Sequence, residues 1–172
     1  PGESRARVRD YVLERLLAFE RELSIVAVRG LDGAMAFYPL TENIHAHGIL
    51  AVSIAPAEVE GTLTSQAQQY ARRLAESLDY VGCFAIEFFV VDGRLLANEM
   101  APRVHNSGHW TMDGATTSQF ENHLRAILGA SGLQVASYLS PHLLDFRERL
   151  QLGSDYADDR QWTCALAQVE AA

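Results

Sequence analysis

One hairpin pattern constrains the fold of this chain more than any other feature. Residues 82–91 read GCFAIEFFVV, residues 94–100 read RLLANEM, and Asp92–Gly93 separates the two runs. Aromatic and β-branched residues favour strands, and an Asp-Gly pair favours the tight turn that joins two antiparallel strands. The pattern therefore predicts a long antiparallel hairpin against which the other elements pack.

Three further segments have strand patterns. Residues 22–30 and 34–40 flank an Asp32–Gly33 turn signal, and residues 48–56 read GILAVSIAP, with Pro56 at the end. Strands with Gly-containing turns between them favour an antiparallel sheet. Together with the helices described next, they predict an α+β fold in which an antiparallel sheet packs with helices.

Helical periodicity occurs in two central segments. Ser65–Leu78 is predicted to be an amphipathic helix with a Thr or Ser as N-cap, and a second helix is predicted from about Ser118 to Leu128. Residues 1–20 fit either a helix or an extended segment that leads into a strand, and the pattern of Leu139–Leu150 is compatible with a helix. The apolar face of the first helix is defined by Tyr70, Leu74 and Leu78.

Composition argues against several classes of function. The net charge of −8 disfavours nucleic acid or an anionic membrane as the partner. No apolar run approaches the roughly 20 residues of a membrane helix, and Cys83 and Cys164 have no metal-ligand spacing. These features predict a cytoplasmic protein. All 14 basic residues are arginine, so chemistry that requires a lysine on a phosphate is incomplete within this chain.

Glu87 interrupts the most apolar strand of the predicted hairpin. A buried charge is costly unless it is paired or bound to a metal. With a strict two-residue turn, Glu87 lies opposite Asn98 and Glu99 points to the other face of the sheet. With a longer turn or a β-bulge, Glu87 lies opposite Glu99. The sequence leaves this register open.

Two interpretations of Glu87 are also open at this level. Oxygen ligands on neighbouring strands suit Mg²⁺, which favours Glu87 and Glu99 as metal ligands. Alternatively, Glu87 is a carboxylate on an edge strand that reaches water, or it is neutralised by Arg103.

A polar segment, NEMAPRVHNSGHWT at residues 98–111, follows the hairpin. Arg103 offers a planar fork of donors for phosphate or carboxylate. The backbone N–H groups of residues 106–108 are candidates to face an anion, and His105 and His109 are candidates for proton transfer or anion binding. The density of such groups after a carboxylate hairpin favours a functional site over a surface loop.

These residues also resemble a known family. The segment NEMAPRVHNSGHWT, preceded by the glutamate of AIEFF, is similar to the signature of 5-(carboxyamino)imidazole ribonucleotide synthase, an ATP-grasp enzyme of purine biosynthesis. FYPLTENIHAHGIL and GATTSQFENHLRAILG are similar to the same family, in the same order. The resemblance extends from about Val12 to Gly129.

The resemblance implies an ATP-dependent ligase. In this family ATP phosphorylates bicarbonate to carboxyphosphate, whose CO₂ passes to the amine of aminoimidazole ribonucleotide. The implied cofactors are ATP and Mg²⁺, and the implied partners are the two small-molecule substrates and, in the full-length enzyme, a second copy in a homodimer. Neither nucleic acid nor a membrane is implied.

The resemblance also implies roles for individual residues. Glu87 and Glu99 match the metal carboxylates, and Asn98 with Glu99 matches the contact to the nucleotide phosphates. Residues matching nucleotide contacts are Glu14, Arg15, Leu16, Leu17, Glu22 and His45, and those matching the bicarbonate or carboxyphosphate cradle are Arg103, His105, Asn106 and Ser107.

The chain also departs from the family pattern. Family members are much longer and carry phosphate-binding lysines, and Arg15 and Leu16 replace a polar-Gly pair at the nucleotide hinge. We therefore expect residues 1–129 to be the C-terminal half of an ATP-grasp domain and residues 130–172 to be a divergent, partly helical tail. Two alternatives remain: another ATP-grasp enzyme, such as the formate-dependent glycinamide ribonucleotide transformylase, or a non-catalytic nucleotide-binding module.

Overall fold

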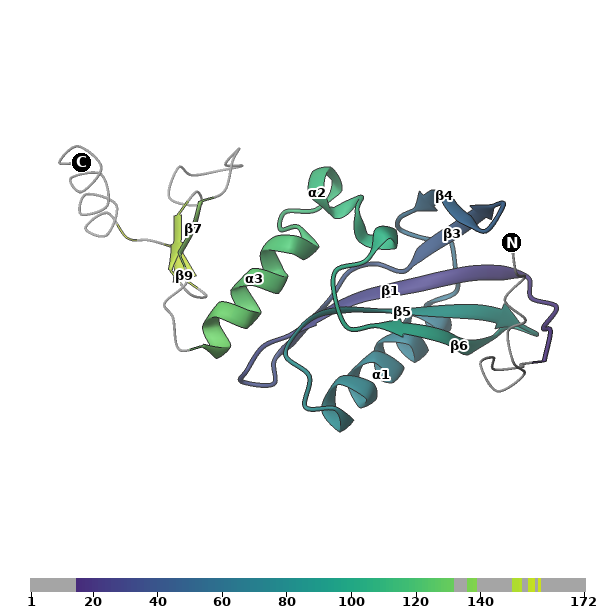
Figure 1. The fold of residues 1–172 in the computed structure, drawn as a ribbon, viewed down its shortest axis with the longest axis horizontal. Helices are drawn as coiled ribbons and strands as arrows, with labels where there is room; N and C mark the ends of the chain where they lie inside the picture. The colour runs from purple at the N-terminus through teal and green to yellow at the C-terminus, as the bar shows by residue number, and fades with distance from the viewer. Residues whose placement is uncertain (1–14, 132–135, 139–149, 153–154, 157, 159–172) are drawn as a thin grey trace, which may run out of the picture.

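The computed structural model describes residues 15–131, 136–138, 150–152, 155–156 and 158. Its main body is one antiparallel sheet with helices on both faces, which confirms the predicted α+β class (Figure 1). The strands are β1 (Arg21–Arg29), β2 (Met35–Phe37), β3 (Thr41–Ala46), β4 (Ile49–Ile54), β5 (Gly82–Val91) and β6 (Arg94–Ala101). The helices are α1 (Gly61–Ser77), the 3-10 turn η2 (Asn106–Gly108), α2 (Thr111–Gly114) and α3 (Gln119–Ala130).

The predicted hairpin forms the central and outer parts of this sheet. The strand order is β4-β3-β1-β5-β6, and β2 pairs with the far end of β1. β5 is therefore enclosed between β1 and β6, and all neighbouring strands run antiparallel. Sequence patterns identified every strand of this sheet except β3, whose TENIHA segment begins with three polar residues and forms a β-bulge with β4.

Helix α1 covers one face of the sheet, and of the three residues that the sequence pattern favoured, Leu74 packs against the core. The fully buried positions are Ala67, Ala71 and Ala75, whereas Tyr70 and Leu78 are exposed. Small side chains line the contact because the helix lies close to the sheet, and the larger ones flank it. The helix also begins at Gly61, earlier than predicted, and its N-cap Glu60 makes no side-chain capping bond.

Helix α3 and the segment after β6 cover the opposite face (Figure 1). As predicted, the helix begins after Ser118, whose hydroxyl accepts the Glu121 N–H as an N-cap. Two side chains fix α3 to the sheet: the Asn122 amide donates to the Tyr38 hydroxyl at 2.7 Å, and His123 Nδ1 accepts the Cys83 N–H at 3.0 Å. The site described below lies on this α3 side of the sheet.

The described part of the tail is a separate three-stranded sheet. It consists of β7 (Ala136–Tyr138), β8 (Leu150–Leu152) and β9 (Asp155–Tyr156), paired in that order. The helices considered for residues 1–20 and Leu139–Leu150 fall mostly outside the described residues; Arg15–Phe19 are non-helical, and Leu150 is in β8. Along the described ranges, no helix is long and apolar enough to cross a membrane.

Candidate active site

The open question of register is answered by a β-bulge in the hairpin. Val91 pairs with Arg94 across a strict two-residue turn, and this pairing continues to Phe88 and Ala97. At the next position the register shifts, so that Glu87 lies opposite Glu99 and Asn98 is the extra residue. Of the two registers that the sequence left open, the structure has the one with a β-bulge: the turn is tight, but Glu87 lies opposite Glu99 and not opposite Asn98.

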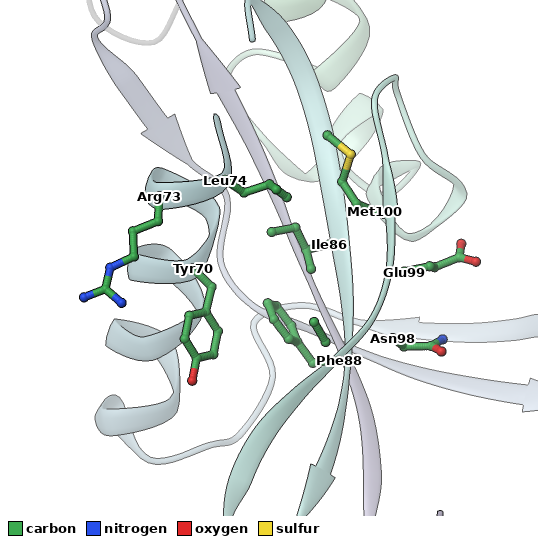
Figure 2. Close-up of a pocket in the computed structure, with 9 residues that line it drawn as sticks. Tyr70, Arg73, Leu74, Ile86, Phe88, Asn98, Glu99 and Met100 are labelled. Atoms are coloured by element: carbon green, nitrogen blue, oxygen red, sulfur yellow. The ribbon is translucent and has the colours of Figure 1, made fainter. Parts of the chain in front are cut away.

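The bulge decides which face of the sheet receives Glu99. Leu95 is buried in the core on the α1 side, and strict alternation would place Glu99 on that same face. One extra residue turns Glu99 to the α3 side, which is how bulges re-aim side chains beside functional sites. Asn98 and Glu99 point away from α1, beyond Ile86 and Phe88 (Figure 2).

Glu87 is a confined carboxylate, contrary to the interpretation that it reaches water from an edge strand. β5 is an internal strand, and the side chain of Glu87 is 14% exposed. Burial raises the pKa of Glu87, and the negative charge of Glu99 raises it further. Arg103 does not neutralise it: the guanidinium of Arg103 donates to the Val104 carbonyl at 2.9 Å.

His105 completes a compact group with the two carboxylates. Its Nε2 lies 3.8 Å from Glu87 Oε1 and 4.0 Å from Glu99 Oε1, and its Nδ1 lies 2.9 Å from Ser107 Oγ. Burial lowers the pKa of His105, and the nearby positive charge of Arg103 lowers it further. A neutral imidazole next to two carboxylates leaves a net negative site.

The same three residues fit a divalent cation by their donor chemistry. One ligand atom from each of Glu87, Glu99 and His105 lies within 4.8 Å of the others. Mg²⁺ in proteins is held by one or two carboxylates together with phosphates and waters, so the two carboxylate oxygens are sufficient protein ligands. Burial, and after it the negative charge of Glu99, raises the pKa of Glu87, and a bound cation would offset both effects.

The polar segment after β6 behaves differently from the predicted anion-binding loop. The N–H of Ser107 donates to Asn106 Oδ1, that of Gly108 to the His105 carbonyl, and that of His109 to the Asn106 carbonyl. The Ser107 and Gly108 donors are therefore used inside the 3-10 turn. That the Asn106 N–H faces an anion stays a prediction. His109 is exposed and stacks on Phe120, with ring centroids 6.0 Å apart.

The four side chains that match the bicarbonate or carboxyphosphate cradle differ in their exposure. Arg103 and Asn106 are exposed next to the carboxylates, whereas His105 and Ser107 are buried. The bulged Asn98 is exposed beside Glu99. The segment thus has exposed polar side chains at its surface and a buried imidazole beneath them.

A second predicted pair lies on the same face of the sheet. His45 Nδ1 is 2.9 Å from Glu22 Oε2, and both side chains are about one-quarter exposed. The charges of His45 and Glu22 both act on the pKa of Glu87, the first lowering it and the second raising it. The structure therefore brings Glu22 and His45 from β1 and β3 into one site with the carboxylates.

Two buried polar side chains in this region were not identified from the sequence. Ser24 is opposite Glu87 on β1, and Asn43 is opposite Glu22 on β3. Both are buried, and Ser24 Oγ and Asn43 Nδ2 have no hydrogen-bond partner within the described part of the chain. The period-two placement of polar residues at 22 and 24, and at 43 and 45, is the signal that would have found them.

The predicted nucleotide-hinge residues precede the sheet in the chain. Arg15, Leu16 and Leu17 belong to no helix or strand, and Leu16 is 95% exposed. Glu14 lies outside the described residues. Their assignment to the hinge stays a prediction.

Comparisons with known proteins match most of the chain to one domain family. Residues 3–120 match the ATP-grasp domain family. Among individual proteins, the chain is 55% identical over 118 residues to an N5-carboxyaminoimidazole ribonucleotide synthase of Vibrio parahaemolyticus, covering 69% of this chain and 31% of the relative. It is 49% identical over 116 residues to the synthase of Escherichia coli, covering 67% and 33%.

Solved structures agree with these sequence matches. The N5-carboxyaminoimidazole ribonucleotide synthetase of Thermus thermophilus superposes with a TM-score of 0.65 and 61% identity, over 66% of this chain and 32% of that one. The Aspergillus clavatus synthase, in complex with ADP and 5-aminoimidazole ribonucleotide, gives a TM-score of 0.61 and 37% identity, over 64% and 30%. The chain spans about a third of the length of the proteins it matches.

Proposed function

Because the chain belongs to the ATP-grasp domain family, we propose that it is the part of an N5-carboxyaminoimidazole ribonucleotide synthase that carries the metal carboxylates. The reaction would be the ATP-dependent carboxylation of aminoimidazole ribonucleotide by bicarbonate, through carboxyphosphate. The observation that supports this most directly is the opposition of Glu87 and Glu99 across a bulge, beside His105.

The residues of this chain have two roles in the proposal. Glu22 and His45 would contact the nucleoside part of ATP, and Glu87 and Glu99 would hold Mg²⁺. Bound Mg²⁺ would supply neutralisation of phosphate charge, which is the main requirement of phosphoryl transfer. The exposed Asn98, at the bulge beside Glu99, adds a polar contact to the phosphates.

The second role is the handling of bicarbonate and carboxyphosphate. Arg103 donates from its guanidinium to the anion, for which a planar fork of donors is suited. His105 is held neutral by burial and orients the anion against the carboxylates, with Ser107 fixing its ring from the other nitrogen. Asn106 contributes a side-chain amide at the solvent side.

The lysine-free composition limits what these residues do by themselves. The chain contains no lysine, so any lysine on the ATP phosphates must come from outside these 172 residues. We therefore expect turnover only when the chain is combined with the remaining portion of such an enzyme. The same observation favours the second candidate, a non-catalytic nucleotide-binding module, for the chain alone.

The test is ADP formation that depends on both bicarbonate and aminoimidazole ribonucleotide. It is measured with the chain alone and with the chain combined with the complementary portion of a relative. Activity in the combination supports the proposal, and activity with formate and glycinamide ribonucleotide instead would favour the transformylase alternative. Absence of turnover, with intact Mg²⁺-dependent nucleotide binding by calorimetry, would favour the module.

The metal assignment is tested separately by Glu87→Gln. The variant should abolish Mg²⁺-dependent nucleotide binding because it removes one of the two carboxylates. Glu76→Gln, an exposed change on α1, is the matched control and should leave binding unchanged. Wild-type affinity in Glu87→Gln would refute the assignment.

A further inference from the structure

The backbone of His105 is held by one buried side chain, that of Gln119. Gln119 is the first residue of α3, and it is fully buried. Its Oε1 accepts the His105 N–H at 2.9 Å, and its Nε2 donates to the His105 carbonyl at 2.6 Å. A single side-chain amide thus satisfies both backbone groups of His105, as a neighbouring β-strand would.

The conformation of Gln119 is itself fixed by the segment that it holds. A Cβ at Gly108 would lie 2.6 Å from Gln119 Oε1, so the amide of Gln119 fits there because residue 108 has no side chain. The Gln119 N–H donates to Thr111 Oγ1 at 3.0 Å, and this hydroxyl donates to the Gly108 carbonyl at 2.7 Å. We call this arrangement of His105, Gly108, Thr111 and Gln119 the Gln119 clamp.

The Gln119 clamp is tied to the strand that carries Glu87. One turn along α3, His123 accepts the Cys83 N–H of β5. The position of His105 relative to Glu87 is therefore set through α3 and not only through the chain connection from β6.

We propose that Gln119 is a positioning residue of the site, which keeps the imidazole of His105 beside Glu87 and Glu99. The structural part of this inference stands on the two hydrogen bonds; its effect on turnover rests on the proposed function. A displacement of about 1 Å at a reacting group can lower the rate on the order of 10²-fold. Loss of the clamp should therefore lower kcat by that order, with the KM for ATP unchanged within about twofold.

The main test compares Gln119→Met with Asn122→Ala in the 172-residue chain. Methionine matches the length of glutamine but offers neither hydrogen bond to His105. Asn122→Ala removes another tertiary bond from α3 without touching the clamp. We expect Gln119→Met to speed exchange of the His105 amide hydrogen by at least about tenfold and to shift the His105 imidazole signals in NMR spectra at constant pH. Asn122→Ala should leave both near wild type.

Kinetic measurement then separates positioning from general destabilisation. When the chain is combined with the complementary portion of a relative, Gln119→Met should have a lower kcat than wild type. Asn122→Ala should have the wild-type kcat. Wild-type His105 exchange, imidazole signals and kcat in a folded Gln119→Met variant would overturn the inference. If the wild type itself forms no ADP with bicarbonate, the proposed function fails, and the two NMR readouts still decide whether Gln119 positions His105.

A second variant covers the case in which Gln119→Met does not fold. Gly108→Ala displaces the amide of Gln119 from the other side while leaving its chemistry intact. It should move the same His105 signals. Unchanged His105 signals in folded Gly108→Ala would count against the clamp.

Discussion

Glu87 and Glu99 face each other across the β5–β6 hairpin because β6 carries one residue more than its partner strand at that point. Without the bulge at Asn98, the alternation that buries Leu95 on the α1 side would direct Glu99 to the same face. The pairing of the two carboxylates therefore depends on the register of β5 and β6. Its electrostatic consequence is a pair of negative charges in which Glu87 is largely buried and Glu99 is exposed, which leads to the first prediction.

The stability of the metal-free protein should depend on the ionisation of Glu87. Burial and the charge of Glu99 raise the pKa of Glu87 above its value in the unfolded chain. A carboxyl shifted in this direction stabilises the fold fully below its unfolded pKa of about 4.3, and this contribution is lost as pH rises through the folded pKa. Urea unfolding with a chelator present should therefore show declining stability over that range.

Glu87→Gln should remove this decline, because glutamine does not ionise, and should make the metal-free protein more stable than wild type at neutral pH. Glu76→Gln is the control and should keep the pH dependence of the wild type. Parallel stability–pH curves for Glu87→Gln and wild type would contradict the assigned burial.

Gly108→Ala should destabilise the fold. The new Cβ would lie 2.6 Å from Gln119 Oε1, and Gln119 is held by two hydrogen bonds, so strain of about 1–3 kcal/mol is expected. Gly129→Ala is the matched control, because a Cβ there meets nothing within 4 Å in helix α3. Removing a helical glycine should stabilise by about 0.5–1 kcal/mol. Urea unfolding of both variants measures the difference, and equal effects would argue against the tight contact.

The His45–Glu22 pair should contribute to nucleotide affinity. Glu22→Gln leaves the imidazole without its charged partner 2.9 Å away. In the proposed function Glu22 accepts a hydrogen bond from the nucleoside, and a hydrogen bond to a charged group contributes about 1.5–3 kcal/mol, so we expect the Kd for Mg-ATP to rise at least about tenfold in calorimetry. His47→Ala, an exposed change two residues from His45, is the control and should bind as wild type does. Unaltered affinity in Glu22→Gln would remove this pair from the nucleotide site.

Cys83 should be chemically inert in the native state. The thiol is fully buried, and burial raises its pKa to about 12. In a Cys164→Ser background, so that one thiol remains, a thiol reagent at pH 8 should label the protein only after unfolding in urea. Rapid labelling of the native protein would contradict the packing of β5 against α3.

Most of the fold could be predicted from local patterns. The hairpin, α3 and its Ser118 cap follow from strand propensity, turn chemistry and capping, which act between residues close in sequence. The contact face of α1 could be predicted only in part from the same patterns. The predicted Leu74 packs against the core, but the fully buried positions are alanines, which carry little hydrophobic signal in the sequence.

For the candidate site, too, some features follow from the sequence and others depend on the tertiary structure. The sequence by itself determined which groups are available: two hairpin carboxylates, a polar segment with His105, and the family resemblance that the comparisons bear out at the level of the ATP-grasp domain. Only the tertiary structure decided that Glu99 joins Glu87, because a bulge changes the facing of every residue beyond it. It also decided that Gln119 holds His105, since hydrogen bonds between residues fourteen positions apart leave no periodic trace in the sequence.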